Sequence, residues 1–464
     1  MKAPQAIANR DEPESPMHAE SRRSTAGCAS VVLALLWVVG CDTAREPSGP
    51  TRGPAMIPPG AVAAKATGLT VTASNPSFGE QGQTNEQVTI TGTGFTADSK
   101  AAWLRNGVVD TTITVTSTQY VSPTTLTATI SISSKSPVDY RDIRVTTNGG
   151  RTQGIGSLLF EVTQAVQIAG TSWVRSINDN GEATGTLASG DGVFYYSVQT
   201  GHLETVSTTG TGYDISTTGT TIVGSGGVGG GFPYVYVRVG GAWQGTALPI
   251  GPTSTSGIAR LMLTDGTGQA ALIGGIEYGT GAVTWTWQAA SGSWKRSVLP
   301  GNPAEVRHRA VSASGILGGT TSGPAVWMPN GTGGYTVTTL ANAGAVNGVR
   351  WDGGMLVGFT SGPVYWLAQP GGTWSAPVTV AGGCNGIKDI ADAGRIILND
   401  CPFRTKGQTF AAYADAPYAS LSRLGGFGPQ GNVGFASGIS RGGHFAAGNA
   451  TVNNQSVGIY WTLP

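Results

Sequence analysis

The chain has 464 residues, which is too long for one ordinary hydrophobic core and predicts two or three domains. Only 11% of the residues are charged and 73 are glycine, a composition that favours many short strands joined by tight turns. The formal net charge is +1, so the chain offers no basic field to replace the counterions of a phosphate backbone. We therefore expect an all-β protein with no nucleic-acid partner.

An apolar segment near the N-terminus follows a pair of arginines and ends at a cysteine. Arg22 and Arg23 precede the uncharged run 24–40, which closes with Val38-Val39-Gly40-Cys41. Positive residues, an apolar core and a small residue at the break are the parts of a secretory signal. The closing four residues resemble the lipobox of bacterial lipoproteins, in which the cysteine is lipidated and becomes the mature N-terminus.

This resemblance implies that residues 1–41 are a lipoprotein signal peptide lipidated at Cys41, with Met17 as an alternative start; an uncleaved signal anchor is the other interpretation. Residues 42–66 carry five prolines among glycine, alanine and threonine, so they are expected to form an extended tether. The predicted location is the cell envelope, with the folded part anchored to the membrane by lipid and facing the periplasm or the cell exterior.

Residues 67–163 show the alternation of apolar and polar residues that is typical of half-buried strands. Seven short strands in just under a hundred residues predict a β-sandwich. The predicted strands cover residues 69–72, 87–91, 101–104, 113–116, 125–132, 142–146 and 158–162.

Three motifs in this segment carry a family resemblance. They are Asn75-Pro76-Ser77-Phe78-Gly79, Thr91-Gly92-Thr93-Gly94-Phe95 and Val145-Thr146-Thr147-Asn148-Gly149-Gly150. Together they resemble the IPT/TIG family, which implies an immunoglobulin-like fold. In bacterial surface proteins such modules mostly act as spacers, and we expect a spacer here.

Residues 164–464 contain seven copies of an apolar residue followed after a few positions by glycine. The copies begin at Ile177, Ile215, Leu263, Val311, Val349, Ile390 and Ile439. Each copy is followed by an aromatic strand, at Phe194–Tyr196, Tyr234–Tyr236, Trp285–Trp287, Trp327, Tyr365–Trp366, Phe410–Tyr413 and Tyr460–Trp461. Units of about 40 to 50 residues with four strands each predict a seven-bladed β-propeller, with these aromatic residues packed between blades.

The seventh copy leaves room for only three strands before the chain stops at Pro464. We expect the apolar segment Ala165–Ala169 to supply the fourth strand and close the ring. The hairpin Ile177-Asn178-x-x-Gly181 resembles a bacterial extracellular repeat family named for a His-Ala-Phe signature, although the signature histidine is missing from the aromatic strands.

No catalytic, cofactor-binding or metal-binding residue is predicted. His202, His308 and His444 lie in different blades without a shared motif, and Asn178-Asp179-Asn180-Gly181 is interpreted as a turn rather than a calcium loop. Cys384 and Cys401 form a disulfide if the chain is exported, and are two buried thiols otherwise. The polar residues that could line the channel are Asp265, Glu277, Arg307, His308 and Arg309.

The sequence therefore predicts a monomeric, lipid-anchored surface protein that binds an extracellular protein or glycan through a propeller and has no catalytic activity. The alternative is a carbohydrate-active propeller enzyme, either a lyase or a glycoside hydrolase, whose acidic residues meet at the channel mouth. A glycoside hydrolase needs two carboxyl groups about 5 to 9.5 Å apart. The enzyme hypothesis therefore requires such a pair in the channel, and the binding hypothesis does not.

Overall fold

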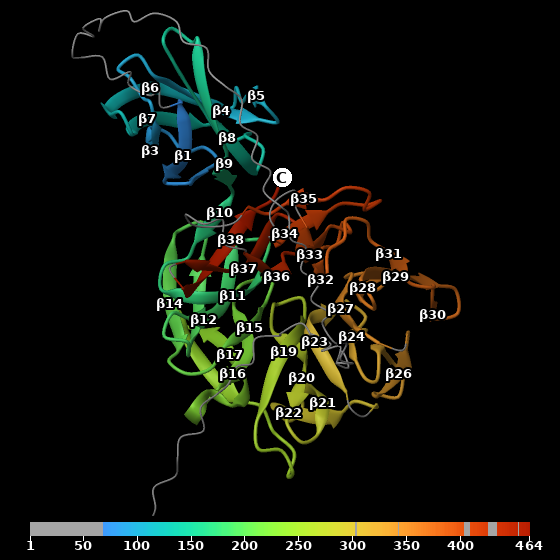
Figure 1. The fold of residues 1–464 in the computed structure, drawn as a ribbon. Helices are drawn as coiled ribbons and strands as arrows, with labels where there is room; N and C mark the ends of the chain where they lie inside the picture. The colour runs from blue at the N-terminus through green and yellow to red at the C-terminus, as the bar shows by residue number, and fades with distance from the viewer. Residues whose placement is uncertain (1–67, 302–303, 342, 403–408, 426–433, 453) are drawn as a thin grey trace, which may run out of the picture. The chain divides into compact units, whose positions relative to one another are not determined.

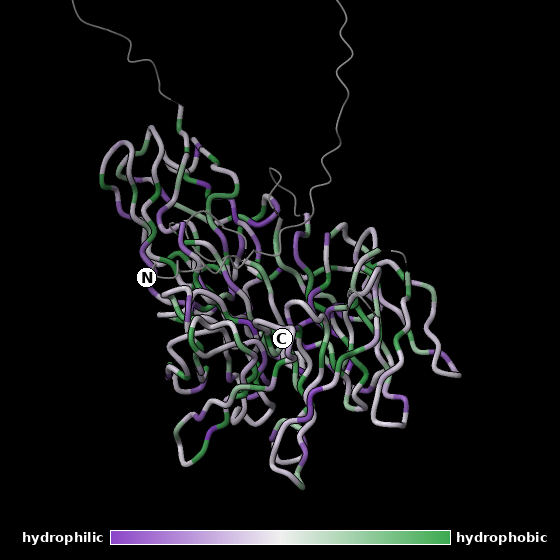
Figure 2. The backbone as a smooth tube through the Cα atoms, turned by 90° about the horizontal axis from the view of Figure 1, so that it is seen from below, coloured by the Kyte–Doolittle hydropathy of each residue, from purple (hydrophilic) through white to green (hydrophobic). Residues whose placement is uncertain are grey.

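The computed structural model describes residues 68–301, 304–341, 343–402, 409–425, 434–452 and 454–464. Over these ranges the chain is built from strands, with one short 3-10 turn at Val228–Gly230, and no helix is long and apolar enough to cross a membrane. Figure 2 shows short hydrophobic stretches interrupted by neutral and hydrophilic residues along the backbone, as expected for strands with two different faces. Cys41 and the tether lie outside the described residues, so their assignments stay predictions.

The N-terminal part contains two sheets. One has the order β1 (Thr70–Asn75), β3 (Glu86–Thr93), β7 (Thr125–Ile132), β6 (Ile113–Ser122), and the other the order β2 (Phe78–Glu80), β9 (Thr152–Thr163), β8 (Asp139–Thr147), β4 (Lys100–Arg105), β5 (Val108–Val109). The two sheets share one buried core, in which the rings of Trp103 and Phe160 meet edge to face at 5.6 Å. All seven predicted strands are present. The two that were missed, β2 and β5, have three and two residues, too few to show alternation.

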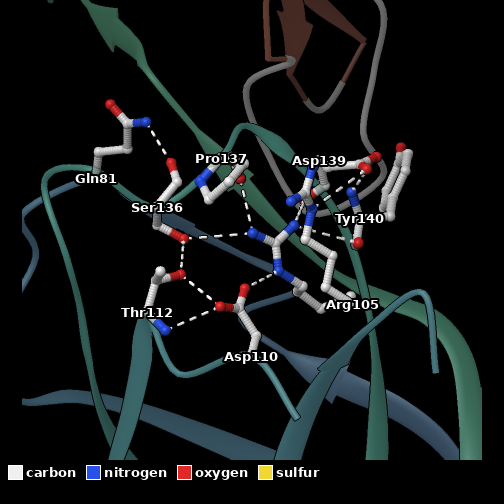
Figure 3. Close-up of polar contacts among 9 residues, drawn as sticks. Gln81, Arg105, Asp110, Thr112, Ser136, Pro137, Asp139 and Tyr140 are labelled. Atoms are coloured by element: carbon white, nitrogen blue, oxygen red, sulfur yellow. Dashed lines mark hydrogen bonds and ion pairs between the residues drawn. The ribbon is translucent and has the colours of Figure 1, made fainter. Parts of the chain in front are cut away.

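A buried arginine organises one end of this core. Arg141 is fully buried, pairs with Asp110, and donates to the carbonyl oxygens of Pro137 at 2.7 Å and Asp139 at 2.8 Å. Figure 3 shows how Thr112 extends this network, since its hydroxyl group donates to Asp110 at 2.6 Å. A buried charge is tolerated only when it is paired and hydrogen-bonded, and both conditions are met.

The rest of the described chain forms seven antiparallel sheets, the blades of a β-propeller (Figure 1). Blades 1 to 4 are β11 (Thr171–Ile177) to β14 (His202–Ser207), β15 (Gly212–Ile215) to β18 (Ala242–Ala247), β19 (Gly257–Thr264) to β22 (Ser293–Val298), and β23 (Glu305–Val311) to β26 (Tyr335–Thr339). Blades 5 to 7 are β27 (Ala345–Val349) to β31 (Val378–Thr379), β32 (Gly386–Ile390) to β35 (Ser422–Arg423), and β36 (Phe435–Ile439), β37 (Phe445–Val452), β38 (Gln455–Thr462) with β10 (Ala165–Gln167). The first strand of each blade, β10 aside, is innermost and contacts the first strand of the next, and β36 of blade 7 contacts β11 of blade 1.

Ring closure follows the predicted route. β10 pairs with β38 in antiparallel register, with Ala165 opposite Trp461 and Val166 opposite Tyr460. The strand just before blade 1 is therefore the outer strand of blade 7. This pairing joins the first and last segments of the propeller and leaves no unpaired edge between them.

The predicted packing role of the aromatic third strands is confirmed for Trp285, Trp327 and Trp461, and it is wrong for Trp287, which keeps 42% of its surface exposed. Trp285, Trp327 and Trp461 are fully buried, and their indole nitrogens donate to the carbonyl oxygens of Pro249 at 2.7 Å, Pro300 at 2.8 Å and Gly425 at 2.8 Å respectively. Each carbonyl belongs to the segment that enters the same blade. The tryptophan thus packs between its own blade and the preceding one, and it fixes the incoming chain with its single polar atom.

Cys384 and Cys401 form the predicted disulfide, and both residues are buried. The bond joins residues 17 apart in sequence and encloses the first hairpin of blade 6. A loop of this size is expected to contribute about 3 kcal/mol by restricting the unfolded chain.

We expect the double substitution Cys384→Ala and Cys401→Ala to lower the free energy of unfolding by that amount in urea titrations. Dithiothreitol should then destabilise the wild type and leave the double variant unchanged; equal sensitivity would contradict the prediction.

Candidate functional site at the channel mouth

The hairpins that lead each blade are held by their own polar residues. In blade 1 the Asn178 side chain accepts from the amides of Asn180 at 3.0 Å and Glu182 at 2.9 Å, and Gly181 takes the left-handed φ of 72°. These residues therefore form the predicted turn. The Asn178 amide also donates to Ser216 O of blade 2 at 2.9 Å, so the hairpin ends of neighbouring blades are tied together around the channel.

Every innermost strand contains a bulge, and the bulge in blade 4 is the largest. In the six other blades the inner strand skips one residue against its partner, as between Gly212 and Asp214 in blade 2. In blade 4 residues 307–310 stand opposite the single residue Gly318. A bulge redirects side chains, and here it carries Arg309 with a left-handed φ of 59°. For a non-glycine residue this conformation is strained, and such residues concentrate at functional sites.

The side chain of Arg309 reaches three other blades. Its Nε lies 3.7 Å from Asp214 Oδ1 of blade 2 and 3.5 Å from Asp389 Oδ2 of blade 6, and its Nη1 donates to Ile177 O of blade 1 at 3.2 Å. A Cβ atom at Gly438 of blade 7 would lie 3.1 Å from Nη1, so glycine leaves the space that this arginine occupies. Arg309 thus joins two carboxylates that come from different blades.

The two aspartates occupy equivalent positions and make equivalent bonds. Asp214 accepts from the amide of Met262 in blade 3 at 3.1 Å, and Asp389 accepts from the amide of Ile439 in blade 7 at 3.1 Å. Asp214 also accepts from the Ser176 hydroxyl group at 2.9 Å. Because both carboxylates approach the same nitrogen of Arg309, the oxygens that face it lie at most about 7 Å apart, below the upper limit of about 9.5 Å for the carboxyl pair of a glycoside hydrolase.

Burial gives both carboxyl groups a raised pKa. Desolvation is the main cause for Asp214 and for Asp389, and the charge of Arg309 opposes it in each case. The pKa of Asp389 rises to about 6. Two carboxyl groups this close titrate as a pair, so one of them keeps its proton to higher pH than an ordinary aspartate.

Above this pair lies the mouth of the channel. Arg441 of blade 7 places its guanidinium carbon 3.2 Å from the centre of the Trp351 ring of blade 5. Burial lowers the pKa of Arg441, and the nearby carboxylate of Asp392, which accepts no hydrogen bond from it, opposes this effect. The space here is about 40 Å³ and is lined by Asn178, Asp179, Asp214, Ile215, Ser216, Thr217, Met262, Thr264, Arg309, Val311, Val349, Trp351, Asp389, Ile390, Asp392 and Arg441.

Of the five polar residues predicted for the channel, only Arg309 lines this space. His308 and Arg307 belong to the same bulge, where the His308 ring contacts Tyr213 O and Arg307 lies 3.8 Å from Glu305. The other two stay within blade 3. Glu277 is bound by Arg296 at 2.6 Å, and Asp265 holds its own hairpin turn by accepting from Thr267.

The two aspartates were missed although the repeat contains a signal for them. Each stands immediately before the first apolar residue of its copy, at Ile215 and Ile390, where other copies have Ser176, Ala310, Gly348 or Gly438.

The predicted start of the third copy is wrong by one residue. Met262, rather than Leu263, takes the position of Ile439, because the leading hairpin of blade 3 is longer than the others.

Within the described ranges, no group of three or more histidine, cysteine, aspartate or glutamate side chains is arranged to hold a metal ion. What the mouth does contain is two arginines and four carboxyl groups, of which those of Asp214, Asp389 and Asp392 have a raised pKa because they are buried. This set can bind an anion and can give and take protons.

No protein-family model matches the chain, and no curated protein matches its sequence. Among solved structures it is similar to a gluconolactonase from Xanthomonas campestris, at 9% identity and a TM-score of 0.34 over 64% of this chain and 89% of the other. It is also similar to the periplasmic gluconolactonase of Pseudomonas aeruginosa, at 14% identity and a TM-score of 0.28 over 85% and 94% of the two chains. A third is the extracellular domain of a hybrid two-component system of B. thetaiotaomicron, at 13% identity and a TM-score of 0.28 over 83% of this chain and 56% of the other.

The prediction that the chain has no catalytic activity is contradicted by these comparisons, because two of the similar proteins are named as enzymes. It rested on the absence of a contiguous catalytic motif, whereas a propeller brings together residues from separate blades. At 9–14% identity the likeness assigns no substrate, and the chemistry of this chain has to be argued from its own channel.

Proposed function

We propose that the protein is a hydrolase of the cell envelope that acts on a carbohydrate-derived substrate at the mouth of the propeller channel. The observation that carries this proposal is the convergence of two buried carboxyl groups, Asp214 and Asp389, on the single guanidinium of Arg309. Acid–base hydrolysis of a glycosidic bond uses two carboxyl groups that face one site, and this pair lies below the upper limit of their separation.

Both carboxyl groups have a raised pKa, so we assign their roles from their hydrogen bonds: the Ser176 hydroxyl group donates to Asp214 and favours its ionised form. Asp389, with a pKa of about 6, is the proton donor to the leaving oxygen, and the partner carboxylate accepts a proton from the attacking water. Arg309 positions both groups and favours ionisation of the acceptor. The space of about 40 Å³ exceeds the roughly 10 to 15 Å³ that a cavity needs to hold one water molecule. It therefore suits the water that is consumed, while the sugar would lie across the open mouth.

The remaining parts of the chain fit a secreted enzyme held at a surface. The buried disulfide supports an oxidising compartment, and the lipobox-like Val38–Cys41 supports lipid attachment. The two-sheet N-terminal part, with its IPT/TIG-like motifs, is proposed as an immunoglobulin-like spacer that carries the propeller.

Growth in labelled fatty acid is expected to label the wild type and not Cys41→Ser; equal labelling of both would contradict the lipid anchor.

The hydrolase proposal is tested with the purified full chain and a panel of chromogenic glycosides, oligosaccharides and sugar lactones. We expect at least one member to be hydrolysed, and Asp214→Asn to lower that rate by about 100-fold or more. Asp415→Asn is the matched control, because Asp415 is an exposed carboxylate of blade 6 that pairs with Arg395 outside the channel.

Circular dichroism and thermal melting establish that each variant is folded. A structural role alone would lower the melting temperature and the rate together, and would leave the shape of the pH profile unchanged. If the wild type and the double variant Asp214→Asn/Asp389→Asn release product at the same rate from every substrate, the proposal is wrong.

A further inference from the structure

Arg441 differs from most arginines of the propeller. In the part of the chain that the structure describes, its guanidinium group makes no hydrogen bond and no ion pair, and its close contact is the face of Trp351. Most other propeller arginines pair with a carboxylate, namely Arg238, Arg260, Arg296, Arg307, Arg309, Arg350, Arg395 and Arg423. Arg441 lines the cavity at the channel mouth together with the two catalytic aspartates of the proposal.

The stack on Trp351 prepares this guanidinium for a ligand. Its carbon atom lies 3.2 Å from the ring centre, so the side chain is already fixed before anything binds. An arginine that is ordered in advance loses less conformational entropy on binding. The N–H groups of a guanidinium lie in its own plane. When that plane is parallel to the Trp351 ring, the N–H groups point sideways from the stack and are available to a planar acceptor.

The charges around Arg441 select the kind of anion. Burial lowers the pKa of Arg441 and the charge of Arg309 acts in the same direction, whereas the carboxylates of Asp214, Asp392 and Asp179 oppose both. A phosphate group, with close to two negative charges, would be repelled by these carboxylates more strongly than a group with one charge. A single carboxylate matches both the one charge and the two-pronged geometry of the guanidinium.

We propose that Arg441, held by Trp351, is a subsite for the carboxylate of an acidic sugar, so that the substrate is a saccharide of the uronic-acid type. This inference rests on the proposed hydrolase and names its substrate class. Arg441 is a binding residue in this scheme and takes no part in proton transfer.

The test compares p-nitrophenyl glucuronides with the matching glucosides, which differ only in the carboxylate. The wild type is expected to prefer the acidic member by at least about 10-fold in kcat/KM, through KM. Arg441→Gln should remove this preference, and Arg441→Lys should restore part of it. Arg350→Gln is the matched control, since Arg350 precedes Trp351 but pairs with the exposed Asp352 instead of entering the cavity.

Calorimetry with glucuronate, glucose and inorganic phosphate separates this inference from the hydrolase proposal. Binding of glucuronate that is lost in Arg441→Gln supports the subsite even if no glycoside is turned over, in which case the hydrolase proposal alone is wrong. Turnover of neutral and acidic substrates at the same kcat/KM, without binding of glucuronate, overturns the subsite and leaves the hydrolase standing. Phosphate binding tighter than glucuronate overturns the choice of a carboxylate.

Discussion

Asparagine in place of Asp389 is expected to lower kcat by about 100- to 10,000-fold, the usual range for loss of a general acid. Asparagine keeps the size of the side chain and can still accept from the amide of Ile439, but it has no proton to give. The measurement is kcat on whichever panel substrate the wild type hydrolyses, with Asp415→Asn beside it. A variant that keeps more than a tenth of the wild-type kcat would show that Asp389 is not the acid.

The same substitution has a pH signature. With the pKa of Asp389 at about 6, wild-type kcat should fall as pH rises above that value, because the acid form disappears. The residual activity of Asp389→Asn should lack this limb. An unchanged limb in the variant would assign the titration to another group.

Stability should respond to the same group in a defined direction. The pKa of Asp389 is about 6 in the folded protein against an ordinary 3.8, so between these values the folded state binds more protons than the unfolded state. Stability from this group is therefore lost as pH rises from about 4 to about 6, and the raised pKa of Asp214 acts in the same direction. Carboxylates with a lowered pKa, such as Asp110, change the stability in the opposite direction. The contribution of Asp389 is therefore isolated by comparing the melting temperatures of the wild type and Asp389→Asn at each pH. We expect the variant to gain relative stability as pH rises; a constant difference would contradict this.

Trp327→Ala is expected to cost about 3 to 5 kcal/mol in free energy of unfolding. The side chain is fully buried between blade 4 and the preceding blade, and its indole nitrogen satisfies the carbonyl oxygen of Pro300. Removal of the ring leaves a cavity between adjacent sheets and an unmet carbonyl group. Urea titration followed by far-ultraviolet circular dichroism measures the change.

Two further variants divide this cost. Trp327→Phe keeps most of the volume and removes the hydrogen bond, so it should cost about 1 to 2 kcal/mol. Trp287→Ala is the exposed control, because this tryptophan of blade 3 keeps 42% of its surface accessible, and its loss should cost less than about 1 kcal/mol. Equal costs for Trp287→Ala and Trp327→Ala would show that burial between the blades is not what makes these residues important.

Much of the architecture could be predicted because it follows from short patterns of residues that repeat along the chain. The spacing of glycine and aromatic residues set the blade count, and the short seventh copy pointed to Ala165–Ala169 as the closing strand that pairs with β38. Alternation over 97 residues located the strands of the N-terminal sheets, apart from β2 and β5. The disulfide could be predicted from the export signal and from the proximity of Cys384 and Cys401 in sequence.

The candidate site could not be predicted in the same way. Asp214, Arg309 and Asp389 are separated by at least 80 residues, and no motif connects them. Arg309 was identified as a polar residue of the channel, but its partners were not, because the length of the blade 4 bulge is a property of strand register. Glu277 attracted attention as an isolated acid and is satisfied within its own blade.

The sequence alone determined what depends on near neighbours along the chain: an all-β composition, the strand periods, the turns with glycine at positive φ and the buried tryptophans. Only the tertiary structure decided which side chains of blades 2, 4 and 6 meet, since that depends on how seven inner strands bring distant residues to one channel. The raised pKa of Asp389 follows from the same cause, because burial and the charge of Arg309 exist only after the ring has closed.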